Sequence, residues 1–155
     1  MDQTQLKITV IGGGHLGIAF VQGILKKNWL RRDQITITRR NIEALQEFSD
    51  QGIAVNRDNV FAVQSADVIF LAVKPKQIES ILKEIQPILK ENQLVVSFVT
   101  GLSFAVIQNI LGNSHPIVRA MPNTALSVAE SMTCLSATHL SDEHYRLMDD
   151  LFGTL

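Results

Sequence analysis

The residues best suited to chemistry in this sequence form a glycine-rich turn near its start. The apolar run at residues 7–11 leads directly into Gly12-Gly13-Gly14-His15-Leu16-Gly17, which fits the pattern G-x-G-x-x-G, and an apolar stretch at residues 16–25 follows. Such glycines allow a tight turn, a close approach of the backbone to a pyrophosphate, and close packing of a helix on a strand. The N–H groups at the start of that helix would bind phosphate. The strand–turn–helix context predicts a dinucleotide site rather than a purely structural turn.

The polar residues after the second apolar run indicate which dinucleotide would bind. Enzymes for the non-phosphorylated cofactor usually place Asp or Glu about 20 residues beyond the glycines, where it binds the ribose 2′-OH. This sequence has Arg39, Arg40 and Asn41 there instead. Guanidinium groups bind a 2′-phosphate in a bidentate manner, and Asn41 is suited to cap a helix that begins at Ile42. We therefore expect NADP, with NADPH preferred over NADH; the alternative is that both arginines are simply solvated.

Alternating short and long apolar stretches predict the elements that must position these residues. Short runs rich in β-branched residues are predicted to be buried strands, at residues 7–11, 35–38, 68–73, 94–99 and 117–120. Amphipathic helices lie between them, one ending near Pro87 and another running from Ser103 to Gly112. A further strand at residues 131–135 and a closing helix at 142–151 complete the chain. The expected fold is α/β, a single Rossmann-type domain with a doubly wound, mostly parallel sheet and helices on both faces.

Composition and charge argue against several classes of protein. The 155 residues correspond to about one domain, and 46% apolar against 19% charged residues is enough for a hydrophobic core. A formal net charge of −1 argues against nucleic-acid binding through phosphate contacts. No apolar run approaches the ~20 residues of a membrane span, and the polar start does not resemble a signal peptide. We therefore expect no membrane partner. The single cysteine is typical of a reducing compartment, so we expect a cytoplasmic domain. The histidines lack the spacing of metal ligands, so we expect no metal.

Several further segments resemble segments of one known family. Residues 66–75, with the sequence ADVIFLAVKP, resemble the fourth strand and following loop of the pyrroline-5-carboxylate reductases. Residues 117–124, IVRAMPNT, are similar to another of their distinctive segments, and residues 130–133 follow at the expected distance. Residues 95–101 stand where the family has a strand that ends in small residues and glycine. The resemblance covers essentially the whole chain.

The resemblance implies an activity and a set of binding residues. The family reduces the cyclic imine pyrroline-5-carboxylate to L-proline, the last step of proline biosynthesis, with a hydride from NADPH or NADH. The implied cofactor-binding residues are Ile11, Gly12, Gly13, Gly14, His15, Leu16, Gly17, Arg39, Arg40, Asn41, Asn59, Ala72, Val73, Lys74, Pro75, Phe98, Val99 and Thr100. Met121, Pro122 and Asn123 would lie beside the substrate, and no catalytic residue is assigned. Ala125, where proline is common, and Thr100, where alanine is usual, depart from the pattern.

Several of these residues also have a structural alternative. His15 either donates to a cofactor phosphate or ribose or is an exposed loop residue without a role. Asn59 either contacts a cofactor ribose or caps the short helix after it, and Lys74-Pro75 either lines the cofactor or only ends a strand. Cys134 is predicted to be a small buried residue rather than a reactive thiol.

The family also carries a second, helical domain, which interlocks in a dimer and holds most of the substrate. This chain ends about where that domain would begin, so we expect a fragment that binds cofactor but has little or no reductase activity alone. A homo-oligomer is expected for the full-length protein, through that second domain. Two alternatives stay open: another NADP-dependent oxidoreductase of the β-hydroxyacid dehydrogenase or deazaflavin-dependent type, and a non-enzymatic nucleotide-binding regulatory module.

Overall fold

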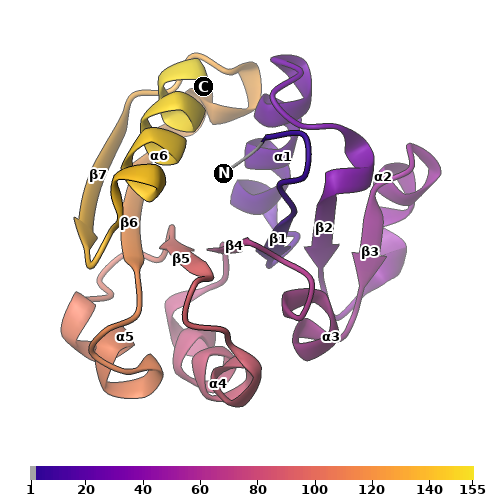
Figure 1. Ribbon diagram of the computed structural model, residues 1–155. Helices are drawn as coiled ribbons and strands as arrows, with labels where there is room; N and C mark the ends of the chain where they lie inside the picture. The colour runs from indigo at the N-terminus through magenta and orange to yellow at the C-terminus, as the bar shows by residue number, and fades with distance from the viewer. Residues whose placement is uncertain (1–2) are drawn as a thin grey trace.

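One sheet with helices on both faces organises the protein, as the computed structural model shows for residues 3–155, the side chain of Thr124 excepted (Figure 1). The strands are β1 (Ile8–Ile11), β2 (Ile35–Thr38), β3 (Ala54–Asn56), β4 (Val68–Leu71), β5 (Leu94–Ser97), β6 (Ile117–Pro122) and β7 (Thr133–Thr138). Their spatial order is β3-β2-β1-β4-β5-β6-β7, in which β1 to β6 are parallel and β7 pairs antiparallel with β6. The first six strands have the order of a dinucleotide-binding fold, so the predicted fold class is confirmed.

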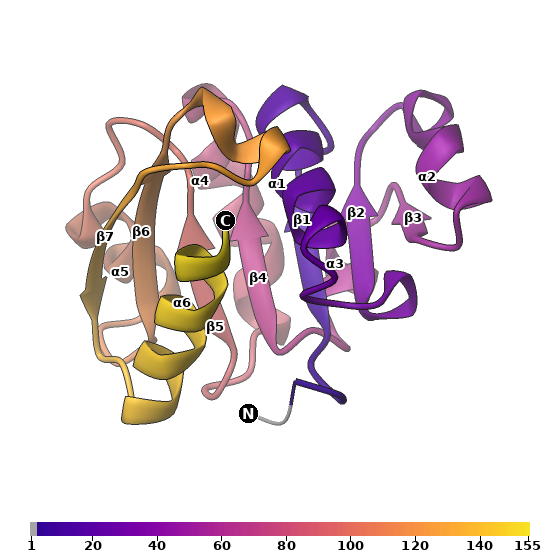
Figure 2. The same ribbon diagram turned by 90° about the horizontal axis from the view of Figure 1, so that it is seen from above.

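Helices α1 and α6 cover one face of the sheet, and α3, α4 and α5 cover the other (Figure 1). Figure 2 looks onto the face that carries α1 and α6. The helices are α1 (His15–Lys26), α2 (Gln46–Asp50), α3 (Asn59–Val63), α4 (Pro75–Ile85), α5 (Phe104–Leu111) and α6 (Asp142–Thr154), and the 3-10 turns are η1 (Arg32–Gln34), η2 (Ile42–Leu45), η3 (Gln86–Ile88) and η4 (Thr124–Val128). Within residues 3–155, none of the helices is both long and apolar enough to span a bilayer.

Side-chain caps and prolines set the helix boundaries. Asn41 accepts a hydrogen bond from the backbone N–H of Glu43 and so caps η2, and Ser103 caps α5 through the N–H of Val106. Both caps were expected from the sequence. Pro75 occupies the first turn of α4, where its missing N–H removes no helical hydrogen bond. The helix ends at Ile85 and continues as η3, the turn that contains Pro87, as predicted.

The alternation of side chains along the strands divides the core into two hydrophobic clusters, one on each face. On the α1 and α6 side, Phe70 packs against Phe20 with ring centroids 4.4 Å apart, and Phe98 lies 5.0 Å from Phe20. On the other side, Ile69 and Leu71 of β4 belong to a cluster with the apolar faces of α4 and α5. The central strands are therefore buried on both faces, as the continuous apolar runs predicted.

The structure differs from the expectations at several elements. Strands β4 and β5 end two residues earlier than predicted, and β3 was not foreseen. The short helix expected after Asn59 is α3, which begins at Asn59 itself. The expected added strand is β7, which begins two residues later and ends three residues later than predicted, and the closing helix α6 extends to Thr154. Cys134 is exposed and not buried as predicted, because it lies on β7, the edge strand of the sheet, and not on a central strand.

Two buried histidines should make folding sensitive to acid. Burial lowers the pKa of His115 and of His144 below the ordinary value of 6.5, and one ring nitrogen of each is buried without a hydrogen-bond partner. As the pH falls through 6.5, these histidines therefore take up protons in the unfolded chain before they do so in the folded protein. Their contribution to the free energy of unfolding is full above that pH and decreases below it. We expect a lower Tm at pH 5.5 than at pH 7.5, measured by calorimetry. His144→Gln should reduce this difference, whereas His15→Gln, which replaces an exposed histidine, should retain it.

Candidate cofactor site

The glycine turn is held between β2 and β4. The N–H groups of Gly12 and Gly13 both donate to the carbonyl of Thr38, at 3.1 and 2.8 Å. Gly12 has a φ of +106°, and a Cβ there would lie 2.5 Å from the carbonyl oxygen of Ala72. A side chain at this position would thus be strained and would collide with the β4 loop, so the turn requires glycine.

Helix α1 begins at the turn with its first N–H groups unpaired by side chains. Gly14 is the N-cap residue, and its carbonyl accepts from the N–H of Ile18 at 2.9 Å. No side chain caps the helix, and its first turn contains no acidic residue. The first N–H groups of an α-helix have no partner within the helix, so those of His15, Leu16 and Gly17 form a donor set with a partial positive charge. This arrangement favours an anion at the start of α1.

A cavity of about 710 Å³ opens beside the turn, at the carboxyl ends of β1, β2 and β4. Predicted cofactor residues line much of it: Ile11, Gly12, Gly13, Gly14, Arg39, Arg40, Asn41, Asn59, Ala72, Val73 and Lys74. The carboxyl edge of a doubly wound sheet is where such folds bind ligands. The structure thus brings the glycine turn, the two arginines and the β4 loop together around one space.

The charge of the cavity lining is strongly uneven, although the whole chain has a net charge of −1. Its basic residues are Arg39, Arg40, Arg57, Lys74 and Lys76, and its one acidic residue is Glu84. This local excess of cations favours a polyanionic ligand. Among the described residues, no three His, Cys, Asp or Glu side chains lie close enough together to hold a metal ion.

The two arginines after β2 have different surroundings. The Nη1 atom of Arg39 donates to the carbonyl of Gly13 at 2.7 Å, and its backbone N–H donates to Asn56 at 3.0 Å. Arg39 is half-buried and braces the glycine turn, whereas Arg40 is exposed. Arg40 is therefore the arginine with more freedom to meet a ligand.

Asn59 joins β2 to α4. Its Oδ1 accepts from the hydroxyl of Thr38 at 2.6 Å, and its Nδ2 donates to Glu84 at 3.1 Å. The helix-capping alternative for Asn59 is wrong, because Asp58 caps α3 by accepting from the N–H of Phe61 at 3.0 Å.

Seven residues that were not predicted from the sequence also line the cavity: Thr38, Arg57, Lys76, Gln77, Ser80, Ile81 and Glu84. Arg57 follows β3, a strand too short for its pattern to be recognised. The α4 residues had a usable signal, because Gln77, Ser80 and Glu84 have the three- and four-residue spacing that places side chains on one face of a helix.

The remaining predicted residues lie outside this cavity: His15, Leu16, Gly17, Pro75, Phe98, Val99, Thr100, Met121, Pro122 and Asn123. Thr100 follows β5, while Met121 and Pro122 end β6, so they share the carboxyl edge of the sheet with the cavity. Phe98 and Val99 differ, because their side chains are 3% and 2% exposed and belong to the core, Phe98 beneath α1 and Val99 in the cluster on the other face. Any contact that Phe98 makes with a ligand must come from its backbone.

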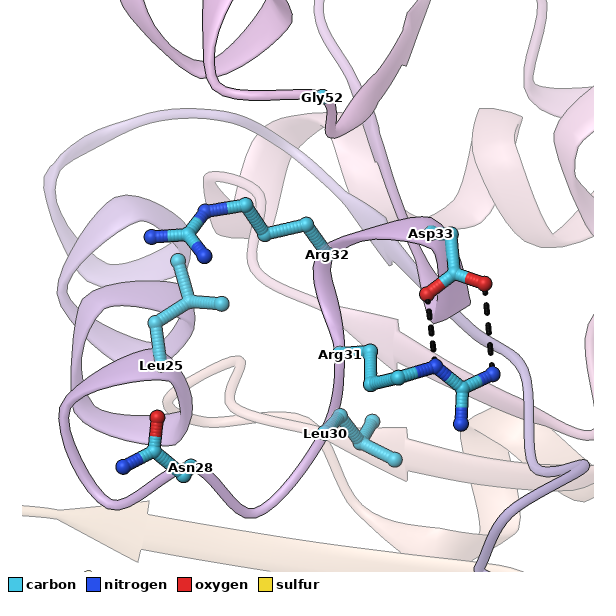
Figure 3. A pocket seen from close by; sticks show the side chains of 7 residues that line it. All are labelled: Leu25, Asn28, Leu30, Arg31, Arg32, Asp33 and Gly52. Carbon is cyan, nitrogen blue, oxygen red and sulfur yellow. Dashed lines mark hydrogen bonds and ion pairs between the residues drawn. The ribbon is translucent and has the colours of Figure 1, made fainter.

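A second hollow, of about 440 Å³, lies at the opposite edge of the sheet, between the end of α1 and the start of β2 (Figure 3). Its Arg31 is paired with Asp33, Nε to Oδ1, at 3.1 Å. The hydrogen bond from Arg31 lowers the pKa of the Asp33 carboxyl. The two charges therefore compensate each other. The hollow also lies at the amino ends of the parallel strands, whereas folds of this kind bind ligands at the carboxyl ends. It is a weaker candidate for a ligand site than the cavity at the glycine turn.

The fold and the cavity together define a dinucleotide-binding domain. The family model described as NADP oxidoreductase, coenzyme F420-dependent, matches residues 7–101. The chain belongs to this family.

Among similar proteins, several are named as one kind of enzyme. A pyrroline-5-carboxylate reductase from Corynebacterium melassecola is 38% identical over 153 residues, which are 96% of this chain and 56% of the relative. The solved pyrroline-5-carboxylate reductase from Coxiella burnetii has 34% identity and a TM-score of 0.89 over 96% of this chain and 56% of its own. The Plasmodium falciparum enzyme, solved with NADP bound, has 23% identity and a TM-score of 0.86 over 98% and 56%, and shares the fold. The resemblance predicted from the sequence is confirmed, and the chain spans about half the length of these relatives.

Proposed function

We propose that this chain is the nucleotide-binding half of a pyrroline-5-carboxylate reductase and that it binds NADP in the cavity at the glycine turn. The observation that carries the proposal is the cavity itself, where the glycine turn that leads into an uncapped helix N-terminus meets five basic side chains. Support comes from the names of the relatives, and from a protein of the same fold that was solved with NADP bound.

Each part of the site has a task in this proposal. The N–H groups at the start of α1 bind the pyrophosphate, and Arg40 with the unoccupied N–H groups of Arg39 binds the 2′-phosphate. The β4 loop, with Lys74, directs the cofactor along the sheet edge toward Thr100 and Met121. When bound, the cofactor would supply a hydride for the carbon of a C=N bond, and with one proton from solvent on the nitrogen this gives a secondary amine.

The proposal assigns substrate binding and dimerisation to a second, helical half. Orientation of two reactants makes a large contribution to a hydride transfer, so the nucleotide-binding half alone should turn over little substrate. We further propose a homo-oligomer of the whole enzyme, and a cytoplasmic location that agrees with a single free cysteine.

Calorimetric titration of this chain with NADPH and with NADH, at low and at moderate salt, tests the proposal. We expect tighter binding of NADPH, with an advantage that shrinks as salt screens the arginines. Equal affinity for NADPH and NADH would show that Arg39 and Arg40 do not bind the 2′-phosphate. Binding of neither would contradict the cofactor site.

Arg40→Ala should separate the two cofactors. Loss of one charge-assisted contact is expected to weaken NADPH binding about tenfold and to leave NADH binding unchanged, because only NADPH has the 2′-phosphate. Arg32→Ala removes an exposed arginine at the opposite edge of the sheet and should change neither affinity. Equal weakening of NADPH and NADH by Arg40→Ala would place Arg40 elsewhere than at the 2′-phosphate.

The description of the matched family model favours one second candidate, an NADP oxidoreductase that uses coenzyme F420. Both candidates use the same NADP site and differ in the hydride acceptor. Incubating the natural protein and NADPH with pyrroline-5-carboxylate or with a deazaflavin, and following NADPH absorbance, distinguishes them.

A further inference from the structure

Glu84 is the one carboxylate that lines the cavity, and it contacts a predicted cofactor residue rather than a cation. Its Oε2 accepts a hydrogen bond from the Nδ2 of Asn59 at 3.1 Å. On the other side of the amide, Thr38 donates its hydroxyl to Oδ1 at 2.6 Å. Thr38 is 1% exposed, and its carbonyl holds the N–H groups of Gly12 and Gly13. Glu84 is thus connected to the glycine turn through Asn59 and Thr38.

The chemistry of these three groups fixes the orientation of the amide. A hydroxyl both donates and accepts, so Thr38 could pair with either the oxygen or the nitrogen of the Asn59 side chain. An ionised carboxylate only accepts, so Glu84 pairs with the nitrogen and not with the oxygen. Glu84 therefore decides which end of the amide faces β2 and which faces α4. Without it, a rotation of the amide by 180° would still leave a hydrogen bond to Thr38.

We infer that Glu84 is a positioning residue, which orients Asn59 so that the second Nδ2 hydrogen serves a ribose or phosphate oxygen of the bound dinucleotide. The inference rests on the proposed function, because it assigns the cavity to that ligand. Asn59 lines the cavity, and its second Nδ2 hydrogen has no partner among the described residues. Glu84 itself donates nothing to the ligand, and its negative charge opposes a polyanion.

Binding of NADPH to single and double variants tests this role. Asn59→Ala and Glu84→Ala should each weaken binding about fivefold, as expected for one hydrogen bond. In the double variant, binding should stay within about twofold of Asn59→Ala, because no amide remains to be positioned. Glu84→Gln can pair with either end of the amide and should fall between wild type and Glu84→Ala. Glu79→Ala, which removes an exposed carboxylate of the same helix outside the cavity, should bind as the wild type does.

The sign of the effect distinguishes positioning from simple repulsion. If Glu84 acted only through its charge, Glu84→Ala and Glu84→Gln would bind NADPH more tightly than the wild type, and the inference would be wrong. A loss that persists in full in the Asn59→Ala background would also overturn it. Wild-type protein that binds neither NADPH nor NADH would refute the proposed function, and the inference with it. Thermal unfolding of each variant shows whether folding is preserved.

Discussion

Gly14→Ala is expected to bind NADPH about a hundredfold more weakly than the wild type while it unfolds at nearly the same temperature. Gly14 lines the cavity, and a Cβ built there meets no atom within 4 Å. Its φ of −90° is accessible to alanine, so the exchange should cost about 0.5–1 kcal/mol as an N-cap substitution, which lowers the Tm by at most about 2–4 °C. The methyl group would occupy the space through which a pyrophosphate reaches the N–H groups of α1. Loss of two such hydrogen bonds corresponds to about 3 kcal/mol of binding free energy.

Calorimetric titration measures this affinity, and Gly153→Ala is the matched control. Gly153 lies in α6 and also has no atom within 4 Å of its built Cβ, but it is absent from the cavity lining. Its replacement should leave the affinity unchanged. Unaltered NADPH binding by Gly14→Ala would show that the phosphates bind away from the glycine turn.

Gly17→Ala should instead destabilise the fold, by about 3 kcal/mol. A Cβ at Gly17 would overlap the carbonyl oxygen of Gly12 and lie 3.2 Å from a methyl group of Val10. The obstructing oxygen belongs to the backbone of the turn, which the hydrogen bonds to Thr38 hold in place. Either α1 moves away from β1 or the turn is displaced, and both disturb the core beneath the helix.

Urea unfolding of Gly17→Ala, beside the wild type and Gly153→Ala, measures this loss as a lower midpoint. The control should be as stable as the wild type or slightly more stable, since alanine favours a helix. A wild-type midpoint for Gly17→Ala would mean that the α1–β1 contact can relax without cost. The pair at positions 14 and 17 would thus separate the binding and packing tasks of one motif.

The sequence was sufficient to predict the fold, and to predict which residues meet at the centre of the candidate site, because local signals coincide there. The apolar runs, the glycine spacing and the caps at Asn41 and Ser103 all indicate the same strand–helix alternation, and the structure has it. The arginines that follow β2 necessarily come close to the glycine turn, because β1 and β2 are adjacent and parallel. This adjacency follows from the topology, so it could be predicted.

What escaped prediction depends on contacts between distant segments. Arg57 enters the cavity through β3, whose three residues carry too weak a pattern for a strand to be recognised. The contact of Glu84 with Asn59 joins two helices whose relative positions no local pattern specifies. Alternate side chains of a strand point to the same face, so the spacing of Leu94, Val96 and Phe98 did indicate that Phe98 is buried in the core.

The bond from Arg39 to Gly13 has a consequence for redesign of this protein. An engineer who wished to reverse cofactor preference would normally replace both arginines after β2 together. Here the replacement of Arg39 would also remove the hydrogen bond to the carbonyl of Gly13. The glycine turn would then be less well held, so the affinity for both cofactors would fall together with the selectivity for NADPH. Variation confined to Arg40 and Arg57 leaves that brace intact. The accessible route to altered selectivity therefore runs through the exposed arginines first.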